Sequence, residues 1–259
     1  MRDFQGIDAN VKDWLRKARE IILDSFNLSL DVETKSGPTD LVTNVDKEVE
    51  RFYIQQIQNA YPEAKILGEE TSKIHPLTNM EGLVFILDPI DGTMNFVKQK
   101  RNFASMIAVY YNNRPLLGYI YDIIRDELYW GGPVYDAVYC NDYQLATPTD
   151  SILSEGLVQL CRPFVMNDSY GFRRVVDASA GLRMYGCAGL EFINVLTGRC
   201  ICYASALRPW DLAAGKILAE SLDLVVETID VKETNMLSSK VVLVATKNAE
   251  KDITKLISI

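Results

Sequence analysis

The sequence contains almost no histidine: His75 is the only one among 259 residues. One histidine cannot form a histidine-rich zinc site, and it would have to be the sole base of any Ser-His-Asp triad. It lies in the turn-like stretch "KIHPLTN", so we expect it in a surface loop. Chemistry in this protein must therefore use carboxylates, hydroxyls, thiols or metal ions.

Cysteine pairs are missing as well. The five cysteines are an odd number, and no CxxC pair occurs among them. Free thiols in a reducing cytoplasm are the simplest explanation of this pattern. The cysteines are Cys140, Cys161, Cys187, Cys200 and Cys202.

Long apolar runs are also absent. The longest, "LVFIL" (83–87) and "VVLVA" (241–245), are far too short to span a bilayer. The first residues, "MRDFQGIDANVKDWLRK", are charged throughout and contain no apolar segment of the kind found in signal peptides. We therefore expect a cytoplasmic protein without a membrane partner.

Positive charge is in deficit, because 27 lysines and arginines face 35 aspartates and glutamates, for a net charge of −8. This balance argues against non-specific binding of nucleic acid or anionic membranes. An acidic protein that handles a phosphate needs a cation or a local positive site. The basic stretches "RKARE" and "KQKR" are typical of solvated faces.

The pattern of apolar residues predicts an α+β fold. Helical spacing occurs over 8–26, from Thr43 or Asn44 to about Tyr61, and over 188–198, 211–221 and 249–258. We expect strands at 64–68, 82–87, 200–204, 223–228 and 241–246, an antiparallel meander over 103–140, and a loop at 34–42. We expect two parts, residues 1–150 and 151–259, each with helices layered on a sheet.

The stretch "LDPIDGT" (87–93) is the strongest chemical signal. Asp88 ends an apolar strand, and Pro89 removes a backbone donor and favours extended geometry before it. A fixed turn then lets the carboxylates of Asp88 and Asp91 converge. Gly92 and Thr93 open a helix whose free N–H groups attract anions. This arrangement suits a magnesium ion that holds a phosphate, although an aspartate-rich turn with a helix cap explains the stretch by itself.

Two further acidic stretches favour the metal site. "ILGEET" (66–71) ends an apolar strand on Glu69 and Glu70, and "PWDLAAG" (209–215) places Asp211 at a helix start. Each alone is typical of a strand end or a helix cap. Acidic residues at two strand ends and at one helix start, in a chain almost without histidine, indicate a shared metal cluster.

In this order, Gly-Glu-Glu, "LDPIDGTMNF" and "PWDLAAG" resemble the inositol monophosphatase family of lithium-sensitive, magnesium-dependent phosphatases. "DLVTNVDKEVE" (40–50) also fits the family, so the resemblance covers nearly the whole chain. It implies an alternating α/β/α/β/α layered sandwich of the sugar-phosphatase type, often a homodimer, that hydrolyses a small-molecule phosphate ester by metal-activated water.

The resemblance also implies roles at matching positions. Two or three Mg²⁺ ions are expected, a first bound by Glu69, Asp88 and the Ile90 carbonyl, and a second by Asp88, Asp91 and Asp211. Thr93 with Asp46 would orient and deprotonate the attacking water, and Lys35 matches a mobile loop near the site. The residues implied to bind phosphate or the substrate's ring are Gly92, Thr93, Gly186, Cys187, Ala188 and Asp211.

The substrate stays open. Inositol 1-phosphate is our first expectation, followed by the 2′-phosphate of NADP(H), fructose 1,6-bisphosphate and 3′-phosphoadenosine 5′-phosphate. Inositol-selective members of the family carry a glutamate six residues before the Trp-Asp pair, where this sequence has Ala204. We expect an alanine there to admit larger or more anionic leaving groups.

Two other functions compete with this one. Cys202 and Arg208 have the C-x5-R spacing of a thiol phosphatase loop, but "YASAL" between them has no glycine and Pro209 follows. A short buried strand is the preferred interpretation. A non-enzymatic role in binding a macromolecule is the second alternative, and no basic patch or coiled coil recommends it.

Overall fold

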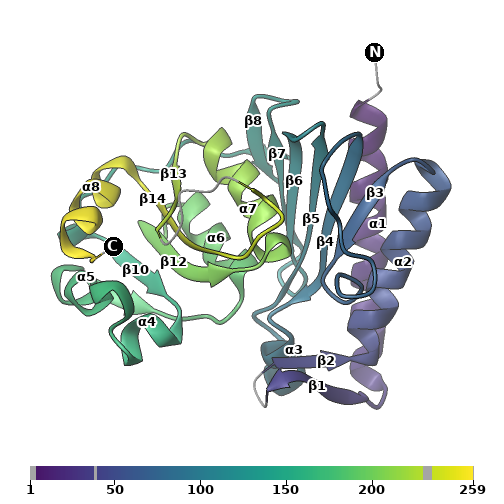
Figure 1. Cartoon of the computed structure of the whole chain (residues 1–259), viewed down its shortest axis with the longest axis horizontal. Coiled ribbons are helices and arrows are strands. Elements are labelled where there is room, and N and C mark those ends of the chain that lie inside the picture. Colours follow the sequence, from purple (N-terminus) through teal and green to yellow (C-terminus); the bar gives the residue numbers. More distant parts are fainter. Residues whose placement is uncertain (1–3, 38–39, 230–234, 259) are drawn as a thin grey trace.

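The computed structural model describes residues 4–37, 40–229 and 235–258. Two β-sheets lie roughly side by side, with helices between them and on both outer faces (Figure 1). Helices α1 (Phe4–Asp24) and α2 (Asn44–Ala60) cover one side of the molecule. The opposite side is covered by α4 (Arg162–Met166), α5 (Phe172–Ala178) and α8 (Lys247–Leu256). The site described below lies near the middle, where both sheets and the inner helices come together.

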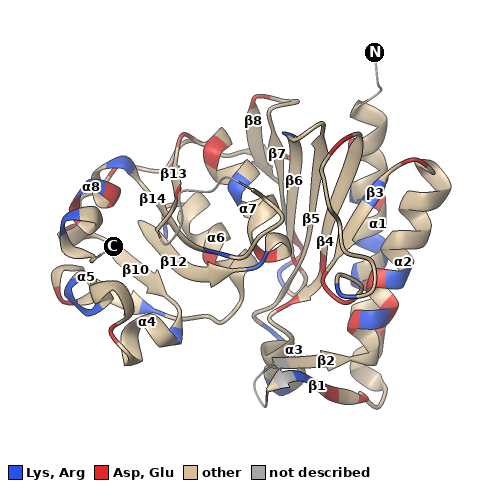
Figure 2. Cartoon of the chain, in the orientation of Figure 1, with Lys and Arg blue, Asp and Glu red and all other residues tan. Residues whose placement is uncertain are grey.

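The two N-terminal helices form because their apolar residues recur on one face. Helix α1 (Phe4–Asp24) buries Val11, Leu15, Ala18 and Ile22. Helix α2 (Asn44–Ala60) begins where Thr43 caps it: the Thr43 side chain accepts from the backbone of the first turn, and Asp46 accepts from the Thr43 N–H in return. Figure 2 shows lysine, arginine and acidic residues interleaved along α2 rather than separated.

The larger sheet has seven strands in the order β3-β4-β5-β6-β7-β8-β9. Only β3 and β4 run parallel, and the other neighbours are antiparallel, which confirms the predicted meander. All nine residues of β4 are buried because both faces of the sheet are covered. The strands are β3 (Lys65–Gly68), β4 (Leu83–Asp91), β5 (Ala104–Tyr111), β6 (Arg114–Asp122), β7 (Glu127–Gly132), β8 (Ala137–Cys140) and β9 (Tyr143–Gln144).

The smaller sheet has five strands in the order β11-β10-β12-β14-β13, with β10 parallel to both of its neighbours. Its strands are β10 (Leu157–Leu160), β11 (Gly181–Arg183), β12 (Cys202–Leu207), β13 (Val225–Thr228) and β14 (Lys240–Ala245). The remaining helices are α3 (Thr93–Gln99), α4 (Arg162–Met166), α5 (Phe172–Ala178), α6 (Ala188–Leu196), α7 (Pro209–Ser221) and α8 (Lys247–Leu256).

Three hydrophobic clusters define five layers and confirm the predicted sandwich. The first cluster joins α1 and α2 to one face of the larger sheet. The second packs α6 and α7 between the other face of that sheet and the smaller sheet. The third lies under α4, α5 and α8 on the far face of the smaller sheet. Because α6 and α7 contact both sheets, the division at residue 150 into two domains stays a prediction.

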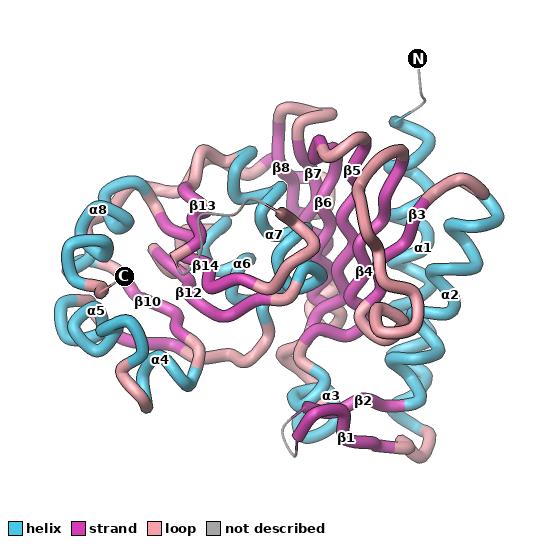
Figure 3. Tube along the Cα trace, in the orientation of Figure 1, coloured by secondary structure: helices cyan, strands magenta, loops and turns pink. Residues whose placement is uncertain are grey.

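The predicted loop at 34–42 is wrong for most of its length. Strands β1 (Val32–Gly37) and β2 (Asp40–Thr43) pair antiparallel as a small separate ribbon (Figure 3). Ser36 and Gly37 of the Ser-Gly-Pro signal are the last residues of β1, and Gly37 pairs with Asp40 of β2. Pro38 lies outside the described residues. The register shifts between Thr34 and Gly37, so Lys35 lies in an irregular part of β1.

The other predicted elements are present with boundary shifts of a few residues. Helix α1 begins and ends earlier than predicted, β12 begins and ends later, and β4 continues to Asp91 instead of ending at Asp88. His75 is exposed, and the five cysteines are free, as expected. Among the described residues, no helix is long and apolar enough to cross a membrane.

Candidate active site

A bulge near the end of β4 positions the first two acidic residues. In a regular strand, residues three apart point to opposite faces. Here Asp88 pairs with Met106 and Asp91 with Ala104, so β4 carries one extra residue between them. Pro89 suits this irregular position because it has no N–H to give to a ladder. The bulge, rather than the turn expected from the sequence, lets both carboxylates face the same side.

Among the described residues, Asp88, Asp91 and Asp211 form a group that could hold a cation. Each offers a carboxylate oxygen, and these oxygens all lie within 4.8 Å of one another. Asp211 comes from the first turn of α7, where it accepts from the Arg208 N–H at 2.8 Å. The start of α7 therefore brings Asp211 to two acids of the bulged strand β4 that lie more than a hundred residues earlier in the sequence.

The electrostatics of Asp88 fit a bound cation. Its side chain is buried, and its Oδ1 has no hydrogen-bond partner among the described residues. Burial raises the pKa of Asp88 well above its ordinary value, and the negative charges of Glu69, Asp91 and Asp211 raise it further. A buried carboxylate is costly without a positive partner. Hard oxygen donors in this number are the ligands that Mg²⁺ prefers, so the residues present fit that ion.

Asp91 is held in place by the start of α6. Its oxygens accept from the Ala188 N–H at 3.1 Å, from the Gly189 N–H at 2.5 Å and from the Cys187 thiol at 3.0 Å. Burial raises the pKa of Asp91, while these three bonds lower it. The predicted substrate-binding residues Gly186, Cys187 and Ala188 therefore lie directly beside a predicted metal ligand.

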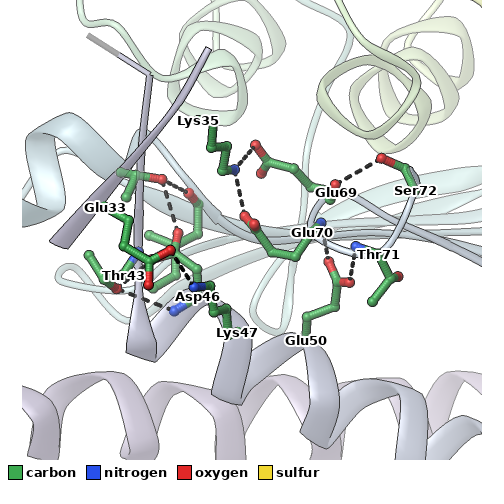
Figure 4. A network of polar contacts seen from close by, with 12 residues as sticks. Glu33, Lys35, Thr43, Asp46, Lys47, Glu50, Glu69, Glu70, Thr71 and Ser72 are labelled. Atoms are coloured by element: carbon green, nitrogen blue, oxygen red, sulfur yellow. Dashed lines mark hydrogen bonds and ion pairs between the residues drawn. The ribbon is translucent and has the colours of Figure 1, made fainter. Parts of the chain in front are cut away.

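Glu69 lies outside the group of three aspartates and is paired with Lys35. The Lys35 ammonium contacts Glu69 at 2.7 Å and Glu70 at 2.6 Å (Figure 4). Burial opposes the charge of Lys35, but the two carboxylates prevail and raise its pKa. The charge of Glu69 still reaches Asp88, whose pKa it raises. The structure thus places Lys35 next to an expected metal ligand.

Asp46 and Thr93 are in direct contact. The Thr93 hydroxyl donates to Asp46 Oδ1 at 3.0 Å and lies 3.0 Å from the Ile90 carbonyl oxygen. The other oxygen of Asp46 accepts from Thr43, so the cap of α2 fixes the carboxylate. Burial raises the pKa of Asp46, and the bonds from Thr43 and Thr93 lower it.

Gly92 links these residues to the substrate side. Its φ of 86° is in the left-handed region that glycine favours, and an added Cβ would lie 3.0 Å from Cys187 Cβ. Helix α3 begins at the next residue. Asn95, buried in the same helix, donates to the backbone carbonyls of Asn102 and Tyr185 at 2.8 and 2.7 Å. The bond to Tyr185 fixes α3 to the segment that precedes α6, and the bond to Asn102 fixes it to the segment that leads into β5.

A pocket of about 270 Å³ adjoins the aspartates. Asp91 and Asp211 line it on one side, and Arg162, Glu191 and Ser205 contribute further polar groups. The other lining residues are Leu160, Cys161, Met184, Gly186, Cys187, Ala188, Tyr203, Ala206 and Leu207. A pocket of this size and mixed polarity suits a small polar molecule.

Glu191 is a residue of this pocket that the sequence interpretation missed. One carboxylate oxygen accepts from the Tyr185 N–H at 2.7 Å and the Gly186 N–H at 3.3 Å. The other oxygen is buried without a hydrogen-bond partner in the described structure. The available signal was a single acid within the mostly apolar "AGLEFINVL" helix, because a glutamate is rarely buried unless it is paired.

Glu191→Gln should stabilise the metal-free protein increasingly as pH rises. Burial raises the pKa of Glu191 to about 7, from 4.5. Between those values the unfolded chain has lost a proton that the folded protein still binds, so the wild type loses stability as pH rises through this window. The gain should approach roughly 3 kcal/mol at most. Thermal unfolding in EDTA at about pH 5 and about pH 8 measures it.

The exposed Glu155, changed to glutamine, is the matched control for this measurement. Its variant should follow the wild type at both pH values. A Glu191→Gln gain that is equal at both pH values would contradict a raised pKa of Glu191 in the folded protein.

The position of β12 contradicts the prediction about Ala204 and excludes the competing thiol phosphatase function. Ala204 is fully buried in the cluster under α4 and α5, on the face of β12 away from the pocket, whereas Ser205 lines the pocket. The expectation that residue 204 faces the leaving group is therefore wrong. Cys202 lies in the same cluster as Ala204, where burial raises its thiol pKa to about 12. A thiolate phosphate loop is excluded, and the predicted buried strand is confirmed.

The fold and the site together define a layered α+β protein with a carboxylate site for divalent cations. The family model described as "Inositol monophosphatase family" matches residues 5–258. This chain belongs to the inositol monophosphatase family.

Relatives of known name agree with this assignment. The inositol-1-monophosphatase of Bacillus subtilis (strain 168) is 40% identical over 260 residues, which covers 98% of this chain and 97% of the relative. Nus factor SuhB of Escherichia coli (strain K12) is 30% identical over 234 residues, which covers 88% of this chain and 86% of the relative.

Solved structures of the family superimpose closely. A dual-specific IMPase/NADP phosphatase bound with D-inositol-1-phosphate gives a TM-score of 0.89 at 28% identity, covering 98% of this chain and 96% of that one. A staphylococcal inositol monophosphatase-1 in a LiCl-soaked inhibitory complex gives 0.92 at 29% identity, covering 99% and 96%.

Proposed function

We propose that this protein is a Mg²⁺-dependent phosphatase that hydrolyses inositol 1-phosphate to inositol and phosphate. The observation that carries the proposal is the group formed by Asp88, Asp91 and Asp211, whose oxygens lie within 4.8 Å of one another beside a polar pocket. Membership of the family supports it, as does the 40% identity to an inositol-1-monophosphatase.

The residues that would hold two or three Mg²⁺ ions are Glu69, Asp88, the Ile90 carbonyl, Asp91 and Asp211. Bound Mg²⁺ supplies positive charge for the phosphate and lowers the pKa of water. Lys35 would have to release Glu69 when a cation takes its place, since an ammonium and a metal ion compete for the same oxygen. Lithium sensitivity of this chain is part of the proposal.

Thr93 and Asp46 would activate the water. The Thr93 hydroxyl already donates its proton to Asp46, so its oxygen can accept a hydrogen bond from an incoming water molecule. The proton of that water would pass to Thr93 as the proton of Thr93 passes to Asp46. No histidine and no covalent intermediate are required. The backbone of Gly92 and Thr93 would hold the phosphate.

The pocket would hold the leaving group. The backbone around Gly186, Cys187 and Ala188 lines it, and Glu191 and Ser205 offer oxygen acceptors for the hydroxyls of a polyol. The volume of about 270 Å³ is slightly below the usual range for ligand pockets, roughly 300–1,000 Å³, which favours a small leaving group such as inositol.

Arg162 favours a second, more anionic substrate. It is exposed and lines the same pocket as Asp91, Glu191 and Asp211. A guanidinium there matches a second phosphate, such as that of fructose 1,6-bisphosphate or the pyrophosphate of NADP. The similarity to a dual-specific IMPase/NADP phosphatase supports this alternative.

Phosphate release from four esters under saturating Mg²⁺ tests both proposals. The panel is inositol 1-phosphate, NADP, fructose 1,6-bisphosphate and 3′-phosphoadenosine 5′-phosphate. We expect the highest kcat/KM for inositol 1-phosphate and no activity in EDTA. Release of phosphate from none of the four esters would contradict the proposed function.

Arg162→Gln should separate the two substrate classes. Loss of the guanidinium should reduce kcat/KM for fructose 1,6-bisphosphate and NADP by roughly tenfold or more, because a hydrogen bond to a charged group contributes about 1.5–3 kcal/mol. The value for inositol 1-phosphate should hardly change. Arg173→Gln, an exposed arginine outside the pocket, is the control. Equal losses on all esters would contradict a role in selectivity.

We also propose that the protein acts as a cytoplasmic homodimer. Its five free cysteines fit a reducing compartment. Light scattering of the purified protein measures the oligomeric state. A non-enzymatic role stays an alternative because one relative carries the name of a Nus factor, and inactivity on the whole ester panel would favour it.

A further inference from the structure

Glu50 is a buried acid that the mechanism above does not use. It lies on α2 one helical turn after Asp46, so both carboxylates project from the same face of the helix. Only 1% of its surface is exposed. The protein must therefore compensate for a charge that it takes out of water.

The compensation comes from the backbone that follows β3. The Glu50 carboxylate accepts from the Glu70 N–H at 2.8 Å and from the Thr71 N–H at 2.9 Å (Figure 4). Each oxygen takes one of these two successive N–H groups. Burial raises the pKa of Glu50, and the bond from Glu70 opposes that shift. The two bonds fix the turn immediately after Glu69.

Gly68 makes this approach possible. A Cβ at this position would lie 2.5 Å from the carboxyl carbon of Glu50, closer than real contacts allow. The residue before Glu69 has to be glycine for the carboxylate to reach the backbone of Glu70 and Thr71. Gly68 and Glu50 thus act together on either side of the Glu69 peptide.

We infer that Glu50 is a positioning residue for the metal ligand Glu69. By holding the N–H groups of the next two residues, it fixes the backbone from which the Glu69 side chain projects. Helix α2 then supplies two functions from successive turns, Asp46 to the water and Glu50 to the metal ligand. This inference rests on the proposed function, in which Glu69 binds Mg²⁺.

Glu50→Gln tests the inference because glutamine keeps the shape but offers only one oxygen to two N–H donors. Calorimetric titration of the metal-free protein with Mg²⁺ should show affinity weakened by roughly tenfold, since groups that orient metal ligands contribute about 10–100-fold. The Mg²⁺ concentration for half-maximal activity should rise equally. The kcat at saturating Mg²⁺ should stay within about threefold of wild type.

Two variants complete the test. Glu48→Gln, an exposed acid on the same helix, should behave like wild type. Gly68→Ala keeps the Glu50 carboxylate but displaces it, and should weaken Mg²⁺ binding as Glu50→Gln does. If Glu50→Gln does not fold, Glu50→Asp replaces it, because a shorter acid keeps the charge and loses the reach.

A merely structural role has a different signature. If Glu50→Gln lowers the melting temperature but leaves calorimetric Mg²⁺ affinity unchanged, the inference is overturned. It is also overturned if kcat stays low at saturating Mg²⁺ with unchanged affinity. The calorimetric result does not depend on any ester being hydrolysed, so failure of the proposed function and failure of this inference are distinguishable.

Discussion

Asp88→Asn is expected to abolish phosphate release while raising the melting temperature of the metal-free protein. Asp88 is the proposed ligand of two Mg²⁺ ions, and the swap removes one negative charge from both. Weaker binding of the Mg²⁺ ions that would stabilise charge in the transition state should lower kcat by at least about 10³-fold, which corresponds to about 4 kcal/mol of transition-state free energy.

The gain in stability has a separate physical cause. In EDTA, the wild type has to bury Asp88 beside Asp91, Asp211 and Glu69, all of them acidic. An asparagine relieves both the burial of charge and the repulsion. The stability gain of Asp88→Asn should grow with pH. Above the ordinary pKa of an aspartate, the unfolded wild type is ionised while the folded wild type still resists ionisation, so the wild type loses stability as pH rises.

Melting curves with EDTA and with Mg²⁺ separate these effects. Mg²⁺ should raise the melting temperature of the wild type more than that of Asp88→Asn, because only the wild type has the full ligand set. Asp177→Asn, an exposed acid on α5, serves as the control and should match the wild type throughout. Wild-type turnover by Asp88→Asn would refute the assignment of Asp88 as a metal ligand.

The sequence was informative about this site where a single element carries the chemistry. Asp88, Asp91 and Gly92 follow one another along β4 and into α3, so their neighbourhood could be predicted from spacing. To include Asp211, we had to assume that the start of another helix lies beside Asp88 and Asp91, and the structure places it there.

What the sequence could not provide was the direction of side chains. A one-residue bulge in β4 decides that Asp88 and Asp91 face the same side, and bulges leave no clear trace in composition. In β12 the alternation of faces decides that Ser205 lines the pocket and Ala204 does not. The prediction that residue 204 faces the leaving group is therefore wrong by one position along the strand.

Residues that act through the backbone were also beyond reach. Glu50 and Glu191 bind N–H groups of segments 20 and 6 residues away. Each looks like an ordinary helical glutamate until the fold brings those segments to it. The ribbon of β1 and β2 was missed for a related reason, since its strands are short and, among the described residues, form a separate sheet of two strands.

Thr93→Ala and Asp46→Asn are each expected to lower kcat strongly, and the double variant should lose little more. In the proposed mechanism both residues belong to one proton path, because the Thr93 hydroxyl lies 3.0 Å from Asp46 Oδ1 and neither would pass the proton of a water molecule without the other. General-base contributions are roughly 10²–10⁴-fold, so each single loss should fall in that range. Mg²⁺ affinity, measured by calorimetry, should change far less.

The double-mutant cycle gives the decisive number. If the two residues act as one unit, the loss of kcat in the double variant should be close to the larger of the two single losses. The coupling free energy should then be comparable to the free energy of the smaller single loss. Asp46 also caps α2, so Thr43→Val is the matched control: it removes the cap hydroxyl and leaves the bond between Asp46 and Thr93 in place. That variant should lose about 1 kcal/mol of stability, the usual contribution of a cap, and keep most of its turnover. Strictly additive losses in kcat for Thr93→Ala and Asp46→Asn would show that the two residues act independently, and the water would then need a different base.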